Sequence, residues 1–185
     1  MKKHVIILLM LLISVSGYAQ RMVYKQKAVE VTVGILDSKE VNGNYYLNLT
    51  VNSFGRHGNY WIWGGEYQRR NIAFRQWNVP VDSYMGELGF SKQLLSDKRK
   101  FITLNLGVTA AAGYEIVNKG ENILFDGARL EDQNQFVYGA GGRLSIETYL
   151  SDRIVFLLQG KLKVLWGTDL EQFRPGAGAG FRINF

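Results

Sequence analysis

Eight charged side chains recur at alternating positions in otherwise apolar segments, and their chemistry is the first thing the sequence must explain. They are Glu66, Glu87, Glu115, Glu147, Arg143, Lys161, Lys163 and Arg182. Apart from Arg143 and Glu147, which share one segment, the acids and the bases stand on different segments, so they can pair only if the fold brings those segments face to face. Buried charges are tolerated when they are paired and hydrogen-bonded. We therefore interpret the eight residues as a structural charge network and not as a binding site.

Catalytic and metal chemistry finds little support in the sequence. The chain has no cysteine, which removes disulfides, thiolate catalysis and cysteine-based zinc sites. After residue 19 it has one histidine, His57, and the spacing around it supplies neither a Ser-His-Asp triad nor a set of metal ligands. The glycine-rich strings 138–142 and 176–180 lack the Lys-Ser/Thr pair of a phosphate loop. We expect no enzyme, no metal and no cofactor.

The element that must position the last of these charges is an alternating segment at residues 174–185. Ala177, Ala179, Phe181, Ile183 and Phe185 share one parity, while glycine, arginine and asparagine fill the other. A period of two sends the two sets to opposite faces of a strand. The pattern is typical of the closing strand of a bacterial outer-membrane barrel, with Phe181, Ile183 and Phe185 as its assembly signal.

The same alternation recurs along the chain and predicts eight strands. Strands of about ten or more residues fit a tilted barrel strand that crosses a membrane, and single-chain bacterial barrels have an even number of strands. The sequence therefore predicts an all-β fold, an eight-stranded antiparallel outer-membrane β-barrel. The expected strands cover residues 28–36, 44–53, 59–68, 81–94, 101–115, 135–150, 153–166 and 174–185.

The connections between these strands alternate in length, which predicts the orientation of the barrel. Short turns are expected at 54–58, 95–100 and 151–153, and longer loops at 37–43, 69–80, 116–134 and 167–173. Outer-membrane barrels have short periplasmic turns and longer outer loops, so we expect both termini to be periplasmic. Aromatic residues near the strand ends would form the two interfacial girdles. These are Tyr45, Trp61, Trp63, Tyr84, Tyr114, Tyr149, Trp166 and Phe185.

Alternation alone leaves the inside and the outside of the barrel undecided. A soluble β-sandwich or lipocalin-like barrel would put the apolar set inside and the charges outside. In a membrane barrel the charges face a lumen that, with eight strands, is only wide enough for side chains to fill it.

The N-terminal segment has the layout of a secretory signal peptide. A basic start is followed by nine apolar residues at 5–13 and then by small residues up to Ala19. We expect residues 1–19 to be the signal and 20–185 to form one barrel domain. Without the two lysines of the signal, 20 basic residues face 16 acidic ones. Because this excess of four is scattered, we expect contact with outer-membrane lipid and no sequence-specific binding of nucleic acid.

The predicted loop 116–134 is the best candidate for a functional surface, because 19 residues make a long loop for a compact barrel. It holds an apolar group within polar surroundings, which either folds over the barrel mouth or contacts a partner. The candidate contact residues are Asn118, Ile123, Leu124, Phe125 and Asp126.

Several short strings, at residues 112–118, 124–127, 136–139, 147–153 and 165–167, carry a family resemblance. Taken together and in order, they resemble the TraO family of conjugative-transposon proteins from Bacteroides and its relatives. The resemblance implies an outer-membrane component of a conjugation apparatus similar to type IV secretion, with other proteins of that apparatus as partners. It implies no enzyme.

Two classes of function stay open. The first is a structural or interaction barrel that serves DNA transfer. The second is an outer-membrane small-molecule binder or lipid-modifying enzyme with its site at the barrel mouth. A cluster of Ser, His and Asp near one barrel end would favour the second class, and the sequence lacks one.

Overall fold

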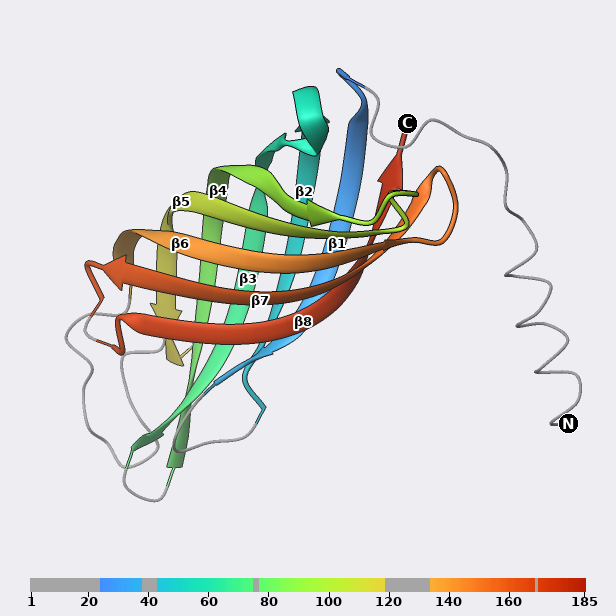
Figure 1. Cartoon of the computed structure of the whole chain (residues 1–185). Coiled ribbons are helices and arrows are strands. Elements are labelled where there is room, and N and C mark those ends of the chain that lie inside the picture. Colours follow the sequence, from blue (N-terminus) through green and yellow to red (C-terminus); the bar gives the residue numbers. More distant parts are fainter. Residues whose placement is uncertain (1–23, 38–42, 75–76, 119–133, 169) are drawn as a thin grey trace, which may run out of the picture.

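The protein folds into a closed barrel of eight antiparallel strands in which each strand pairs with the next and β8 pairs with β1 (Figure 1). The computed structural model describes residues 24–37, 43–74, 77–118, 134–168 and 170–185. The all-β prediction of eight strands is confirmed. The strands are β1 (Lys27–Leu36), β2 (Tyr45–Phe54), β3 (Tyr60–Phe74), β4 (Trp77–Ser96), β5 (Ile102–Val117), β6 (Asn134–Tyr149), β7 (Ile154–Trp166) and β8 (Phe173–Asn184).

Apolar side chains cover the outside of the barrel, whereas its inside holds mostly polar side chains together with two small apolar clusters, one around Phe54 and Ile62 and one around Met85 and Leu165. On β5, Leu106 and Val108 are 47% and 65% exposed, whereas Thr103 and Asn105, on the other face of the strand, are buried. The alternation follows from the period of two in a strand. A soluble barrel would have the reverse arrangement, with its apolar set inside. This distribution is that of a barrel whose outer face meets lipid.

The two ends of the barrel differ in their connections. One end, which we call the turn end, holds the start of β1, the end of β8 and the three short connections β2–β3, β4–β5 and β6–β7 (Figure 1). The β2–β3 connection contains the short 3-10 helix η1 (Arg56–Gly58). The opposite end, which we call the loop end, holds the connections β1–β2, β3–β4, β5–β6 and β7–β8. No helix among the described residues is long and apolar enough to cross a membrane.

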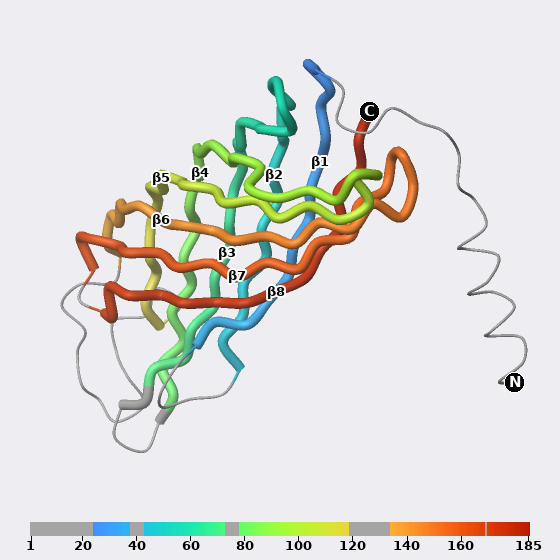
Figure 2. The backbone as a smooth tube through the Cα atoms, in the orientation of Figure 1, coloured from blue at the N-terminus to red at the C-terminus, as the bar shows by residue number. Residues whose placement is uncertain are grey.

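Strands β3 and β4 are longer than the sequence predicted, and the expected loop 69–80 is wrong. Both strands continue as a hairpin past their neighbours, with Asn71 opposite Pro80 (Figure 2). The inward alternation simply persists, because Arg70 and Val81 are opposite each other and both are buried. A proline fits here because β5 pairs with β4 only from Val81 onward, which leaves Pro80 on a free edge.

Most of the aromatic residues expected at the membrane interfaces face outward, but Tyr149 does not. Tyr149 is fully buried inside the barrel, whereas Trp61, Trp63 and Tyr114 are each more than half exposed. The reason is parity: Tyr149 lies two residues after Glu147 on β6, so both point into the lumen.

Strand β8 closes the barrel against β1 in the register Val29↔Ile183 and Val31↔Phe181. Phe181, Ile183 and Phe185, the residues expected to signal assembly, are 53%, 55% and 67% exposed on the outer face. The backbone of Phe185 also exchanges hydrogen bonds with Lys27, so pairing continues to the last residue.

Candidate functional site

The interior of the barrel holds the densest chemistry of the described chain. The eight charged residues expected to form a network all lie inside, and each of them is at most 9% exposed. Their ion pairs form three tiers, which we name the turn-end, middle and loop-end tiers after their position along the barrel. Each tier joins strands that are not neighbours in the sheet, so side chains bridge the lumen from wall to wall.

Arg182 is the centre of the turn-end tier. Its guanidinium donates to the Glu30 carboxylate at 2.7 Å, to Glu147 at 2.6 Å and to the Tyr60 hydroxyl at 2.9 Å. The Tyr60 hydroxyl in turn donates to Glu147 at 2.7 Å. Arg143 completes the tier, 3.5 Å from Glu30 and 3.2 Å from the Tyr60 oxygen. A planar guanidinium suits this position because its donors form a fixed fork.

The middle tier is built on two lysines from β7 and two glutamates from the opposite wall. Lys161 and Lys163 reach Glu66 at 2.5 and 2.7 Å, and Lys163 also pairs with Glu87. Asn48 on β2 donates to both carboxylates, at 3.2 Å to Glu66 and 2.8 Å to Glu87. The four charges therefore share their partners and are compensated as a group.

The Lys161 ammonium also lies 3.1 Å from the centre of the Tyr46 ring. A cation over an aromatic face is attracted by the ring quadrupole, and the attraction is stronger away from water. Tyr46 is itself 1% exposed and points inward from β2. The ring and the ammonium together fill the middle of the lumen.

The loop-end tier pairs Arg174 with Glu115 at 2.5 Å. The hydroxyls of Ser83 and Thr168 donate to the same carboxylate at 2.7 and 2.6 Å. Beyond this tier, Arg70 pairs with Glu171 at 2.8 Å, where the lumen meets the loops.

The interior is balanced in charge. Five glutamates and six basic residues are buried, and the sixth base, Arg70, pairs with the more exposed Glu171, so six acids face six bases. Balanced, hydrogen-bonded charges are the arrangement that makes burial tolerable. The geometry suits a filled lumen, with no free charge left among these twelve residues to hold a ligand.

Glu30, Tyr60 and Arg174 hold central places in the tiers, although the eight residues predicted from the sequence do not include them. Each had a signal. Glu30 alternates with Val29 and Val31, and Tyr60 alternates with Trp61. Arg174 has the same parity as Arg182 on β8. Assigning every residue of each strand to a face by parity alone would have found all three.

The predicted contact loop is only partly described. Asn118 is buried at the end of β5 and has a φ of 50°, a left-handed conformation that asparagine tolerates. Ile123, Leu124, Phe125 and Asp126 lie outside the described residues.

His57 lies in η1 with a φ of 61°. In the described part of the chain, no group of three His, Cys, Asp or Glu side chains could hold a metal ion.

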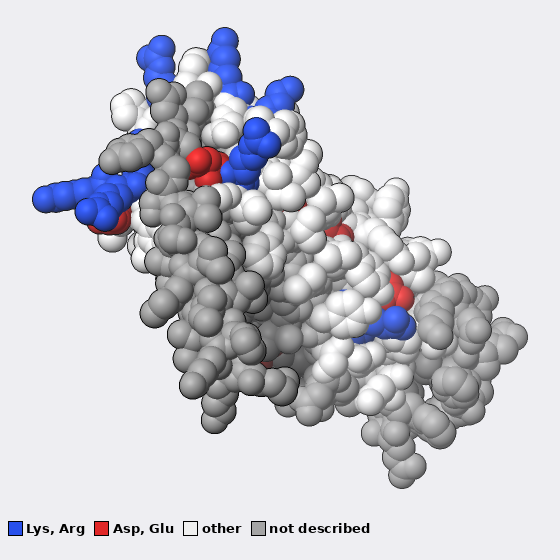
Figure 3. Space-filling view, turned by 90° about the vertical axis from the view of Figure 1, so that its right-hand side faces the viewer, with Lys and Arg blue, Asp and Glu red and all other residues white. Residues whose placement is uncertain are grey.

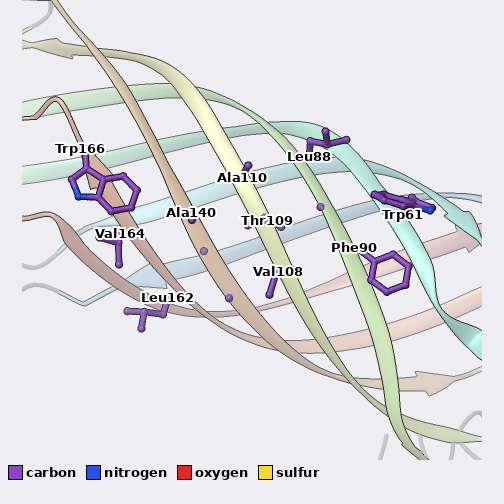
Figure 4. Close-up of a pocket in the computed structure, with 13 residues that line it drawn as sticks. Trp61, Leu88, Phe90, Val108, Thr109, Ala110, Ala140, Leu162, Val164 and Trp166 are labelled. Atoms are coloured by element: carbon purple, nitrogen blue, oxygen red, sulfur yellow. The ribbon is translucent and has the colours of Figure 1, made fainter.

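A hollow of about 580 Å³ lies on the outer face of the sheet and not in the lumen (Figure 4). Its floor is made of small residues on adjacent strands, among them Ala110, Ala140 and Gly142. Larger side chains such as Trp61 and Trp166 stand around it. The hollow carries no charged group, so it offers apolar contact alone.

Comparisons with known proteins agree with this architecture. The solved structure of Neisserial surface protein A (NspA) superposes with a TM-score of 0.63 at 11% identity, over 86% of this chain and 96% of that one. The outer membrane protein OprG from Pseudomonas aeruginosa superposes with a TM-score of 0.52 at 10% identity, over 90% and 99%. No curated protein sequence matches the chain. A family model described as conjugative transposon protein TraO matches residues 23–185.

Proposed function

The chain belongs to the TraO family of conjugative transposon proteins, and on that premise we propose that it is an outer-membrane barrel of the conjugation apparatus with a structural or interaction role. The main support for a structural or interaction role is the lumen, which is filled by side chains and balanced in charge. A barrel without a usable interior acts through its surfaces.

The three tiers argue against a conduit. The Lys163 ammonium reaches from β7 to Glu66 on β3, which is four strands away around an eight-stranded barrel. An interior of this width is filled by side chains and does not admit a DNA strand. Opening it would separate buried ion pairs, each of which costs several kcal/mol when one charge loses its partner. The transferred DNA therefore takes another route.

The outer face and the two ends of the barrel support a location and an orientation. The apolar outer face with aromatics near the strand ends supports insertion in the outer membrane. The short connections at the turn end support a periplasmic position for that end and for both termini. Residues 1–19 direct export, and residues 20–185 form the barrel domain. The protein anchors or stabilises the transfer apparatus, which resembles type IV secretion, at the outer membrane.

The partners are other proteins of the apparatus, and the role is not enzymatic. The loop between β5 and β6, with Asn118 at its start and the apolar residues Ile123, Leu124 and Phe125, is the proposed contact on the loop side. Its apolar residues stand in a polar segment, which is typical of a protein contact.

Conjugal transfer from donors that lack this gene tests the proposal. Transfer frequency should fall steeply in the deleted donor and return when the gene is supplied on a plasmid. Deleting the gene in recipients alone should leave the frequency unchanged. A donor deletion that transfers at the normal frequency would contradict a role in the apparatus.

A further inference from the structure

The exposed basic residues of the described chain are scattered along the sequence, but the fold brings them all to the turn end. We name this set of described, exposed lysines and arginines the basic rim, and Figure 3 shows several blue groups at that end. The described bases elsewhere are buried, or, like Arg69, half-buried and paired with an acid. The basic rim consists of Lys25, Lys27, Arg56, Lys92, Lys98, Arg99, Lys100 and Arg153.

Acidic side chains do not balance the basic rim. Among the described residues at the turn end, only Asp97 and Asp152 are acidic and lie outside the lumen, so eight bases face two acids. The interior, by contrast, is neutral, because its six acids match its six bases. The surplus positive charge of the described chain is therefore concentrated at one end.

The basic rim surrounds the barrel instead of forming a patch on one side. Arg56 lies in the β2–β3 connection, Lys98 in the β4–β5 connection and Arg153 in the β6–β7 connection, while Lys25 and Lys27 lie where β1 meets β8. In a closed eight-stranded sheet these four positions are spaced two strands apart. A protein that docks on one side would meet only part of such a ring.

Exposed apolar residues accompany the basic rim. Leu95 and Phe185 are each 67% exposed, and Tyr24 and Phe101 are 55% and 43% exposed. Lys92 stands on the outer face of β4 between Phe90 and Leu94, where the apolar surface of the barrel gives way to the turn. Lysine and arginine in such places lay their stems along apolar surface and hold their charge at headgroup level.

We propose that the basic rim binds the phosphate headgroups of anionic phospholipids in the leaflet that surrounds the turn end. A ring of cations at the edge of an apolar belt matches the ring of headgroups around an inserted barrel. Each cation near an anionic surface contributes about 1 kcal/mol, which corresponds to about a fivefold preference. The inference depends on membrane insertion but not on the role in transfer. It adds a lipid preference that sets how deeply the barrel sits in the membrane and which leaflet surrounds its turn end.

Quenching of tryptophan fluorescence by brominated lipids measures this preference. Trp61 and Trp63 lie on the outer face near the turn end of β3, so they report on lipid there. The substitutions Trp77→Phe and Trp166→Phe remove the tryptophan fluorescence of the loop end. The protein that carries them is refolded into phosphatidylcholine vesicles. Brominated phosphatidylglycerol is then compared with brominated phosphatidylcholine. We expect phosphatidylglycerol to bind about fivefold more strongly at low salt, and the preference to fall towards one in 1 M salt because the charges are screened.

Matched variants assign the preference to the basic rim. Arg56→Gln, Lys98→Gln and Arg153→Gln together remove one charge from each connection and should lower the ratio, and glutamine at all eight positions of the basic rim should bring it close to one. Lys98→Gln alone should lower it, whereas Gln172→Glu, which removes the same net charge at the loop end, should leave it unchanged. Folding of each variant is checked by its heat-dependent gel mobility.

Two results would overturn the inference. One is a wild-type barrel that shows equal affinity for the two lipids at low salt. The other is a preference that stays undiminished when all eight bases of the basic rim are replaced by glutamine. A rim variant that loses conjugal transfer while wild-type protein has no lipid preference would assign the rim to an acidic protein partner, and it would leave the proposed role in transfer intact.

Discussion

Replacing Arg182 by methionine should unfold the turn-end tier. The side chain is fully buried and holds two carboxylates, Glu30 at 2.7 Å and Glu147 at 2.6 Å, as well as the Tyr60 hydroxyl. After the change, Glu30 keeps Arg143 at 3.5 Å, whereas Glu147 keeps the hydroxyl groups of Tyr60 and Ser145 as donors. Two buried acids then share one distant cation.

The expected loss follows from the cost of an uncompensated buried charge. Removing one partner of a buried ion pair costs about 3–5 kcal/mol, which is a fall of about 150-fold to 5,000-fold in the ratio of folded to unfolded protein. The assay is equilibrium unfolding in urea of the protein refolded into lipid vesicles. Arg153→Met, at the exposed turn, serves as the control: in vesicles of phosphatidylcholine, which offer the basic rim no anionic lipid, it should change the free energy of unfolding by less than about 0.5 kcal/mol.

A second substitution tests whether charge is the cause. Glu147→Gln in the Arg182→Met background removes the stranded negative charge while keeping the shape of the side chain. The double variant should regain part of the lost stability, although Glu147→Gln alone should destabilise the wild-type barrel. The reasoning is refuted if Arg182→Met costs less than about 1 kcal/mol, or if the double variant is as unstable as the sum of the two single variants.

Three further predictions concern the wall of the barrel. Gly178→Ala should destabilise by about 1–3 kcal/mol, because its added carbon would lie 2.3 Å from the Val33 oxygen; Gly160→Ala, with no atom within 4 Å, should not, as urea unfolding of both variants will show. Leu158→Arg, on the outer face, should cost about 2–4 kcal/mol in a bilayer; an unchanged midpoint would contradict lipid contact there. Phe185→Glu should lower the outer-membrane level measured by fractionation and immunoblotting, whereas Phe185→Leu should not; normal insertion of the glutamate variant would contradict the assembly signal.

The strand pattern was predictable because one physical rule, the period of two, operates in every strand. It placed Glu66 and Gln68 on the face opposite Trp63 and Tyr67, as the structure has them. It failed at the β3–β4 hairpin because Pro80 and the polar residues before it are typical of a loop. A proline on a free edge costs a strand little, so composition was misleading there.

The tiers could not be predicted from the sequence, because they depend on geometry across the lumen. Cross-strand register explains one pair, since Glu30 and Arg182 are opposite each other on β1 and β8. Glu66 and Lys163 meet only because strands four apart face each other in a closed barrel of eight. Which lysine meets which glutamate depends on the stagger of the strands around the barrel, and this is not set by the residues of one strand.

The conductance of the refolded barrel in a planar lipid bilayer tests most directly whether the lumen is filled. The account predicts no steady conductance above the bare bilayer, for the wild-type protein as for Gly160→Ala, because three tiers of ion pairs close the interior. Stable single-channel conductance steps would instead show that ions cross the lumen. If Glu87→Gln changed the ion selectivity of those steps, the ions would be passing the middle tier. That result would contradict the filled lumen and with it the proposal that this barrel serves conjugation through its surfaces.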